Sequence, residues 1–172
     1  NMEMKIDSVD PGNVPGVILI KGANVFLGYF KNEEATKAVF TKDGWFRTGD
    51  MGVIDEDGCL FIKGRSKCMI LGPSGQNIYP EEVETVINSQ PYVVDSLVVE
   101  DDGGLTALIY PDFAQGAKDG MNQDTFIKYI EDTLPELNKE LPNYAKLKKI
   151  EVMSEDFERT PKKSIKRYLY QR

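Results

Sequence analysis

VVDSLVVEDDGGLTALIY, residues 93–110, is the stretch that decides the fold of the second half of the chain. Residues 93–100 are rich in β-branched and aliphatic side chains, which favour a strand. Residues 101–104 are Asp-Asp-Gly-Gly, a turn-forming sequence, and residues 105–110 return to mostly apolar side chains. The pattern predicts a β-hairpin over residues 93–110.

Helical patterns lie on both sides of this hairpin. Pro80 suits a first helical position, because acidic residues follow it and Val83, Val86 and Ile87 then supply an apolar face. After the hairpin, Asn122 is a suitable N-cap for a longer helix. Apolar side chains recur along this helix at helical spacing, at Phe126, Ile130, Leu134, Leu137 and Leu141.

Pro135 falls inside that second pattern and should kink or split the helix, because proline cannot donate the backbone hydrogen bond. Residues 149–152 predict one more short strand. From residue 67 onward the order of elements predicts a small α+β domain with an antiparallel sheet flanked by helices.

Residues 1–66 have a different, β-rich character. Short strand-like runs cover residues 16–21, 23–29, 52–54 and 59–63, and the Asp-Gly turn at 55–58 predicts a hairpin between the last two. Residues 32–40 predict a short helix. Bare sheet edges are a liability, so we expect these strands to belong to a larger, distorted barrel. The charged start at residues 2–5 indicates a cut into a longer protein or a cytoplasmic N-terminus.

The composition bounds the location and the partners. The chain has 172 residues, 41% hydrophobic and 28% charged, as is ordinary for a globular protein. No apolar run approaches the ~18 residues that span a bilayer, and no signal peptide opens the chain. We therefore expect a cytoplasmic protein without a transmembrane segment, and peripheral contact with a membrane stays open.

The formal charge of −7 argues against general nucleic-acid binding, which uses clustered Lys and Arg to meet phosphates. Basic residues nevertheless concentrate at 146–149 and at 159–172, and the second segment contains no acid. The tail either meets an anionic group or is a solvated, frayed terminus. Charge alone does not decide between these readings.

The chain contains no histidine, which excludes Ser-His-Asp catalysis and histidine-based zinc sites from these residues. Its two cysteines, Cys59 and Cys68, stand in apolar strand-like segments. We expect both to be buried, reduced thiols, with neither a disulfide framework nor a metal site.

Four segments carry a chemical signal. Thr48-Gly49-Asp50 would place a carboxylate at a strand edge, where it could accept two hydrogen bonds from a ribose diol, although an isolated motif of this kind is usually an ordinary turn. Residues 61–67, followed by the glycine-containing loop 72–77, could reach a phosphate or a ribose. Residues 141–144 (LPNY) alone indicate only a helix end. Residues 159–167 (RTPKKSIKR) are weak in isolation.

Together, in this order and spacing, these segments resemble the adenylate-forming superfamily of acyl-CoA synthetases, peptide-synthetase adenylation domains and luciferases. Residues 16–29 are similar to its GE-L-hydrophobic-G…GY motif, and residues 32–50 to the segment that ends in TGD. Residues 64–67 and 75–84 resemble the hinge and the loop after it. The wording NIYPEEVE at 77–84 looks most like long-chain fatty acyl-CoA ligases.

The resemblance implies a mechanism and a division of roles. An acid and ATP, with Mg²⁺, would form an acyl-adenylate, and coenzyme A would then take the acyl group. Asp50 would hold the ribose hydroxyls, Arg65 would contact the ribose or phosphate, Lys67 would be the hinge, and the Gly75 loop would line the approach of the thiol. The partner would be the large N-terminal adenylation domain of the same protein, to which residues 1–66 would belong. Without that domain the chain would be inactive.

The last motif departs from the family pattern, Thr-Pro-Thr-Gly-Lys-Ile-Lys-Arg. Aligned without gaps, Lys163 stands in place of the glycine and Ser164 in place of the lysine that steadies the carboxylate and α-phosphate. Serine cannot supply a positive charge to the transition state. Lys163, or Lys162, would have to act as a displaced lysine, or adenylation is weakened. The alternatives are a ligase that uses a carrier protein, a peptide-synthetase adenylation domain, or a binding module that has lost its chemistry.

Overall fold

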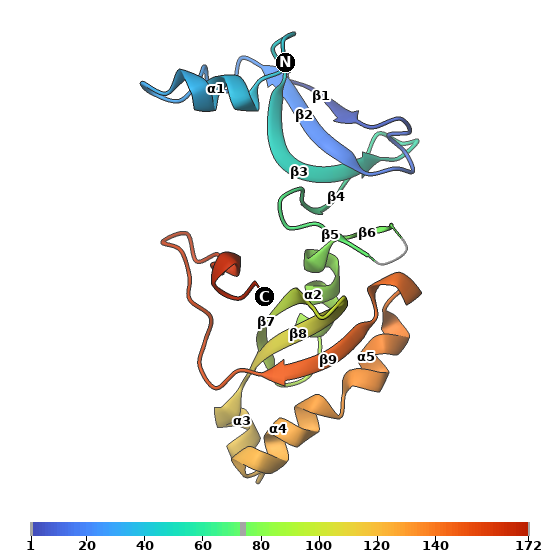
Figure 1. Cartoon of the computed structure of the whole chain (residues 1–172), viewed down its shortest axis with the longest axis vertical. Helices are drawn as coiled ribbons and strands as arrows, with labels where there is room; N and C mark the ends of the chain where they lie inside the picture. Colours follow the sequence, from blue (N-terminus) through green and yellow to red (C-terminus); the bar gives the residue numbers. More distant parts are fainter. Residues whose placement is uncertain (1, 73–74, 172) are drawn as a thin grey trace. The chain divides into compact units, whose positions relative to one another are not determined.

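A four-stranded antiparallel sheet, in the order β1-β2-β3-β4, forms the first unit of the chain, Asn1–Met69 (Figure 1). The computed structural model describes residues 2–72 and 75–171. The strands are β1 (Met2–Asp7), β2 (Gly16–Gly22), β3 (Phe46–Ile54) and β4 (Leu60–Arg65). The strands predicted at 16–21, 52–54 and 59–63 are confirmed. The sheet is open, with β1 and β4 at its edges, and does not close into a barrel.

The strand predicted at residues 23–29 is wrong. The chain turns after Gly22, where the Val25 N–H donates to the Gly22 carbonyl at 3.1 Å. The ring of Phe26 instead joins a cluster with Tyr29, Phe40 and Phe46, at centroid distances of 5.1–5.6 Å. The apolar character of this segment therefore reflects ring packing and not a strand ladder.

Strand β1 was not predicted, because residues 2–5 were interpreted only as a charged start of the chain. It pairs with β2 along its whole length, from Met2 opposite Gly22 to Asp7 opposite Val17. Its alternation was the available signal, since the Ile6 side chain is buried and its neighbours in sequence are exposed.

Helix α1 (Glu33–Val39) confirms the short helix predicted at 32–40. The Asn32 side chain caps it by accepting from the Ala35 N–H at 3.0 Å. The helix buries none of its residues within this unit. Ala35, Thr36 and Val39 are partly buried, so α1 makes only a shallow contact with β3.

The second unit, Ile70–Arg172, is built on a three-stranded sheet in the order β7-β8-β9. Strands β7 (Val93–Asp101) and β8 (Gly104–Pro111) form the predicted antiparallel hairpin. Strand β9 (Leu147–Val152) pairs parallel to β8, a pairing that the sequence did not reveal. The long connection between β8 and β9 carries three helices, and a long crossover of this kind is what allows parallel pairing.

The α-helices among the described residues of this unit are α2 (Pro80–Asn88), α3 (Phe113–Lys118), α4 (Gln123–Glu131) and α5 (Leu134–Glu140). Pro80 starts α2 as predicted. The predicted split of the longer helix is also confirmed, because α4 ends before α5 begins at the residue preceding Pro135. The α+β fold class is confirmed.

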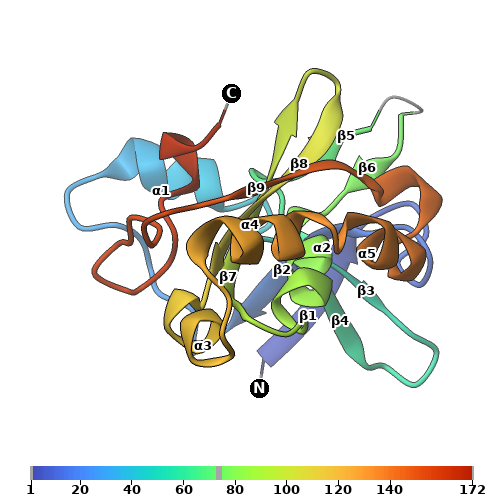
Figure 2. The ribbon, with the colours of Figure 1, turned by 90° about the horizontal axis from the view of Figure 1, so that it is seen from below.

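The two faces of this sheet are covered differently, and helices α2, α4 and α5 lie on one of them (Figure 2). Val98, Ala107 and Ile109 pack in one cluster with side chains of these helices. Leu97, Val99 and Leu108 point to the other face. There they pack against the residues after β9, namely Met153, Phe157, Ile165 and Tyr170. The basic C-terminal segment is therefore folded onto the sheet.

The two cysteines are free, and the expectation that both are buried is wrong. Cys59 is exposed and Cys68 is partly buried. Cys59 precedes the edge strand β4, and its N–H donates to the Asp55 carboxylate at 2.7 Å as part of a surface turn. Among the described residues, every helix is too short or too polar to pass through a lipid bilayer.

Candidate nucleotide and acyl-transfer site

The Thr48-Gly49-Asp50 segment forms a bulge in β3. Arg47 pairs with Leu19 and Met51 pairs with Val17, so the three residues of the bulge face the single residue Ile18. The Thr48 hydroxyl donates to the Ile18 carbonyl at 2.9 Å and accepts from the Asp50 N–H at 3.1 Å. Gly49 has φ of +80°, a conformation that suits glycine. The bulge therefore fixes the backbone that carries the Asp50 carboxylate.

Strand β4 brings Arg65 next to this carboxylate. Asp50 and Arg65 are opposite one another in the ladder, and Arg65 Nη1 lies 2.9 Å from Asp50 Oδ1. The same nitrogen donates to the Thr48 carbonyl at 3.3 Å. The side chains are 37% and 58% exposed for Asp50 and Arg65, so a ligand can reach both. An exposed pair of this kind adds little stability, about 0–1 kcal/mol.

Lys67 lies in the turn that ends the first unit. The Cys68 N–H donates to the Arg65 carbonyl at 3.0 Å, which places Ser66 and Lys67 at the centre of the turn. The Ser66 N–H donates to the Gly49 carbonyl at 3.0 Å, so this turn is tied to the bulge. Lys67 is exposed and stands two residues before Met69, the last residue of the unit.

Gly75 lies in the hairpin between β5 (Ile70–Leu71) and β6 (Asn77–Ile78). Its N–H donates to the Gly72 carbonyl at 2.9 Å, and the Gly72 N–H donates to the Gln76 carbonyl at 2.8 Å. Gly75 has φ of +79° and open space around it. Pro73 and Ser74 of this loop lie outside the described residues.

A second hairpin with the same hydrogen-bond pattern carries Lys163 and Ser164. The Lys163 N–H donates to the Thr160 carbonyl and the Thr160 N–H to the Ser164 carbonyl, both at 2.8 Å. Lys163 has φ of +64°, where a glycine would be expected. The backbone thus agrees with the gap-free alignment that puts Lys163 in the glycine position. Lys162, Lys163 and Ser164 are all exposed.

The residues on either side of this turn hold it to the sheet. Arg159 Nη2 lies 2.8 Å from Asp95 Oδ2 in β7 and 2.9 Å from Asp156 Oδ1. The hydrogen bond from Arg159 holds the pKa of Asp156 below its usual value, and the two acids raise the pKa of the guanidinium. Lys166 donates to Glu158 at 3.0 Å.

Arg167 reaches a carboxylate in α2. Its Nη2 donates to Glu84 Oε2, while Glu84 Oε1 accepts from the Val98 N–H at 2.7 Å. Glu84 is only 8% exposed. Burial raises the pKa of Glu84, and the neighbouring Arg167 opposes that rise. The basic tail is therefore not a frayed terminus, because Arg159, Lys166 and Arg167 are held in ion pairs. For Lys162 and Lys163 no carboxylate partner is found in residues 2–72 and 75–171.

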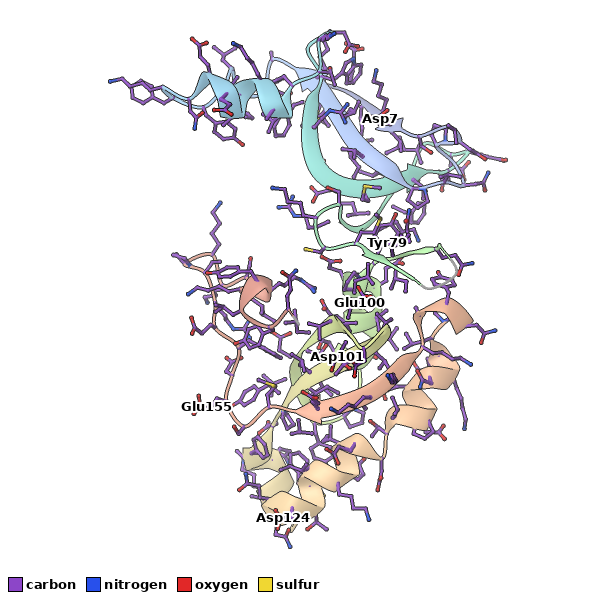
Figure 3. All side chains as sticks on the ribbon, viewed as in Figure 1. Asp7, Tyr79, Glu100, Asp101, Asp124 and Glu155 are labelled. Carbon is purple, nitrogen blue, oxygen red and sulfur yellow. The ribbon has the colours of Figure 1, made fainter. Side chains whose placement is uncertain are left out.

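A cavity of about 290 Å³ lies beside the Gly75 hairpin in the second unit. Its walls include Gly72, the exposed ring of Tyr144, Lys146 and Glu100. Glu100 stands at the end of β7, where the β7–β8 hairpin turns (Figure 3). Sequence reasoning gave residues 141–144 no role beyond ending a helix, so it missed Tyr144 as a wall of a cavity.

The structure thus groups the predicted residues into three places. Asp50 and Arg65 are in contact, and Lys67 follows in a turn bonded to the same bulge. Gly75 and Lys163 occupy separate hairpins of the second unit. Sequence reasoning also missed the role of Glu84. The available signal was its position three residues before Ile87, which places its carboxylate on the buried face of α2. No cluster of three or more Cys, Asp or Glu side chains suited to a metal occurs in the part of the chain described.

Comparison with known proteins identifies a relationship. Residues 68–172 match the family description of the C-terminal domain of AMP-binding enzymes. A 2-methylpropanoate–CoA ligase of Humulus lupulus is 35% identical over 146 residues, covering 78% of this chain and 26% of that protein. A long-chain-fatty-acid–CoA ligase of Mycobacterium tuberculosis is 32% identical over 193 residues, covering 96% of this chain and 32% of that protein. The chain spans about a third or less of the length of these relatives.

The fold of this chain also matches solved structures of related enzymes. The o-succinylbenzoate CoA synthetase of Bacillus subtilis, in complex with its acyl-adenylate intermediate, is 29% identical with a TM-score of 0.77, covering 98% of this chain and 33% of that one. ATP-bound MatB of Rhodopseudomonas palustris is 31% identical with a TM-score of 0.72 over the same shares. The adenylation domain of a carboxylate reductase of Mycobacterium chelonae, 23% identical with a TM-score of 0.84, shares the fold and covers 98% of this chain and 29% of that one.

Proposed function

Since the chain belongs to the adenylate-forming acyl-CoA synthetases, whose C-terminal domain it carries at residues 68–172, we propose that it is part of a ligase that joins a carboxylic acid to coenzyme A. In the first half-reaction the carboxylate attacks the α-phosphorus of ATP, and pyrophosphate leaves. In the second, the thiol of coenzyme A attacks the acyl carbon, and AMP leaves. Residues 1–66 are the β-rich end of the adenylation domain, and residues 67–172 are the small domain that follows it.

The contact between Asp50 and Arg65 is the observation that carries this proposal. Asp50 accepts the two ribose hydroxyls of ATP, since the contact with Arg65 is made through Oδ1 and an ionised carboxylate offers about four acceptor positions. Arg65 stays beside it and turns its remaining N–H groups toward the ribose or phosphate. The bulge supports this geometry by holding the backbone on which Asp50 stands.

The lysines of the 160–164 turn supply positive charge to the transition state of adenylation. Lys163, at the position of left-handed backbone, is the residue we assign, with Lys162 beside it. Both side chains are exposed and without a described acid, so they can approach a phosphate. The Ser164 hydroxyl next to them can donate a hydrogen bond but carries no charge.

The second half-reaction uses the other hairpin of the small domain. Lys67 is the hinge about which this domain turns between the two steps, and its place in an exposed turn close to the unit boundary supports that role. The Gly75 hairpin lines the approach of the thiol. The adjacent cavity has the ring of Tyr144 in its wall beside Lys146 and Glu100, and the ring suits the aromatic part of coenzyme A.

A fatty acid is the substrate we propose, because a relative that matches 96% of this chain is named a long-chain-fatty-acid–CoA ligase. The relatives differ in the acids that their names give. By their names they act on long-chain fatty acids, 2-methylpropanoate and 2-succinylbenzoate. Mg²⁺ enters with ATP, whose phosphate oxygens bind it. The reaction takes place in the cytoplasm.

Pyrophosphate release tests the proposal. The full-length protein that contains this chain is incubated with ATP, Mg²⁺ and a panel of fatty acids, 2-methylpropanoate and 2-succinylbenzoate. We expect release with at least one acid, and no release from the 172-residue chain alone. Asp50→Ala should lower kcat/KM for ATP by about 10- to 100-fold, the value of one or two hydrogen bonds to a charged group.

Asp57→Asn is the matched control, because Asp57 is an exposed carboxylate in the turn before β4 that is not part of the Asp50–Arg65 pair. It should leave pyrophosphate release unchanged. Absence of release with every acid, in protein that still binds ATP, would contradict the ligase.

A second candidate is a binding module that no longer forms the adenylate, and Ser164 is the observation that favours it. Ser164→Lys distinguishes the two. In a ligase weakened at this position the substitution should raise the rate of adenylation, whereas a binding module that lacks other parts of the site should stay inactive.

A further inference from the structure

We infer that Arg159 is a positioning residue for adenylation, because it fixes the turn that carries Lys162 and Lys163. This inference rests on the proposed function, in which those lysines act in the first half-reaction. Arg159 itself stands at the base of the turn, with its side chain 29% exposed, and contacts the turn and not the reacting atoms.

The guanidinium joins three segments at once. Nη2 donates to Asp95 Oδ2 at 2.8 Å and to Asp156 Oδ1 at 2.9 Å, and Nη1 donates to the Lys163 carbonyl at 3.3 Å. Strand β7, the loop before the hairpin and the tip of the turn are thus tied to one rigid group. The planar fork of arginine makes this arrangement, and the single ammonium of lysine cannot reproduce it.

The turn needs this support because its backbone is unfavourable on its own. Lys163 has φ of +64°, which costs a side-chain-bearing residue free energy that glycine would avoid. Among the described residues, two backbone hydrogen bonds lie within the turn itself, from Lys163 to Thr160 and from Thr160 to Ser164. The bond from Arg159 to the Lys163 carbonyl adds a third constraint, at the residue that is least favourable.

Both acids that hold Arg159 are themselves fixed. Asp95 Oδ1 accepts from the Ser96 N–H at 2.9 Å, and the Ser96 hydroxyl donates to Asn88 at the end of α2 at 2.8 Å. Asp156 Oδ1 accepts from the N–H of Phe157, whose ring is buried against the sheet. The orientation of Arg159 is therefore set by the core of the domain.

This geometry predicts an effect on one half-reaction only. The turn at 160–164 presents the lysines for adenylation, whereas the thiol approaches along the separate Gly75 hairpin. Loosening the turn should reduce the fraction of time in which a lysine reaches the α-phosphate, and a misplacement of about 1 Å can cost up to ~100-fold in rate. It should not change the later transfer to coenzyme A.

The experiment compares Arg159→Gln and Arg159→Lys in the full-length protein. We expect Arg159→Gln to lower kcat for pyrophosphate formation by about 10- to 100-fold at an almost unchanged KM for ATP, with less than 2-fold change in thioester formation from synthetic acyl-adenylate. Arg159→Lys should recover only part of the first rate, because it keeps one ion pair and loses the bond to the turn. Hydrogen exchange of the amides at 160 and 162–165 should become faster in both variants.

Glu155→Gln is the matched control. Glu155 is an exposed carboxylate in the loop before the hairpin, and none of the ion pairs found among the described residues includes it. It should change neither half-reaction nor the exchange at the turn.

Three results would overturn the inference: equal loss in both half-reactions, full activity of Arg159→Gln, or unchanged hydrogen exchange at the turn. If the unmodified protein forms no pyrophosphate, the proposed function fails. The exchange data then decide independently whether Arg159 holds the turn.

Discussion

At Lys163 a lysine stands in backbone geometry that glycine prefers. The hydrogen bonds at Thr160 and Ser164 hold it there with φ of +64°. Lys163 therefore lowers the stability of the turn relative to glycine, and it adds a positive charge at the tip of the turn.

Lys163→Gly should raise the free energy of unfolding by about 0.5–1 kcal/mol, because relief of the left-handed conformation exceeds the entropy that glycine adds to the unfolded chain. Pyrophosphate formation should fall in the same variant. Lys162→Gly is the control. Lys162 is not one of the described residues with a positive φ, so glycine at this position should leave the free energy of unfolding unchanged or lower it. Urea denaturation measures both, and equal shifts in the two variants would contradict the argument.

Glu84, which is buried, and Arg167, which is partly buried, form an ion pair whose two partners should not be equally replaceable. Arg167→Met leaves the carboxylate of Glu84 uncompensated and should cost about 3–5 kcal/mol near neutral pH. Glu84→Gln should cost less, since the Arg167 side chain is 21% exposed and can reach water, and the amide oxygen can still accept from Val98. The double variant should be more stable than the sum of the single losses predicts.

The pH dependence of Arg167→Met has a definite sign. Burial raises the pKa of Glu84 and Arg167 lowers it, so the pKa of Glu84 in the folded variant should be raised further. A carboxyl whose folded pKa lies above its unfolded value is most favourable below that unfolded pKa, and stability is lost as pH rises through the folded pKa. The deficit of Arg167→Met should therefore shrink on acidification. A deficit that grows as pH falls would contradict this assignment.

At the scale of elements, the capping, proline and turn signals were reliable, whereas the apolar run at residues 23–29 was not. The α2 start at Pro80, the N-cap at Asn122, the helix split at Pro135 and the hairpin at 93–110 all depend on neighbouring residues, and all are confirmed. The Asp50–Arg65 contact was not predicted, although the hairpin turn at residues 55–58 joins the two strands that carry it.

Long-range pairings could not be predicted in this way. Arg159 meets Asp95 across 64 positions of sequence, and Arg167 meets Glu84 across 83. The parallel pairing of β9 depends on a crossover through three helices. No local pattern encodes such contacts, so the basic tail could be interpreted only by its charge.

The two asparagine caps should respond differently to substitution. Asn122 accepts from the Thr125 N–H and hydroxyl at the start of α4, whose Phe126 and Ile130 are buried in the core. Asn122→Ala should lower the free energy of unfolding by about 1 kcal/mol. Asn32→Ala removes the same kind of cap from α1, which buries no residue, so it should fray that helix locally with little global effect.

Thermal unfolding and hydrogen exchange of the two variants test this difference. Asn122→Asp, which keeps a side-chain acceptor, should restore most of the stability. An equal loss in Asn122→Ala and Asn32→Ala would mean that burial does not control the response.

At the scale of the whole molecule, the two units differ in the size of their cores. Of the buried hydrophobic residues among those described, four belong to the first unit: Ile6, Ile18, Leu19 and Met51. The other nineteen belong to the second unit. Small cores give little stability, so the first unit should be the weaker one in the 172-residue chain.

Urea unfolding of this chain should therefore show two transitions. The single tryptophan, Trp45, lies in the first unit, with Lys5 4.4 Å from its ring centroid, so its fluorescence reports that unit alone. We expect its midpoint at lower urea than the midpoint of far-ultraviolet circular dichroism, which is dominated by the helices of the second unit. Coincident midpoints would contradict the expectation that the two units unfold independently.

The number of residues in the bulge at Thr48–Asp50 bears on how a ribose site of this kind can arise. Between the pairs Leu19–Arg47 and Val17–Met51, strand β3 contains two residues more than β2. Because side chains alternate with a period of two, an even insertion leaves every later residue on the same face of the sheet. Asp50, the carboxylate assigned to the ribose, thus lies in a segment that is two residues longer than its partner strand. The two extra residues do not exchange the buried and exposed faces of β3. A lineage could gain or lose that dipeptide while the hydrophobic side of the sheet stayed intact.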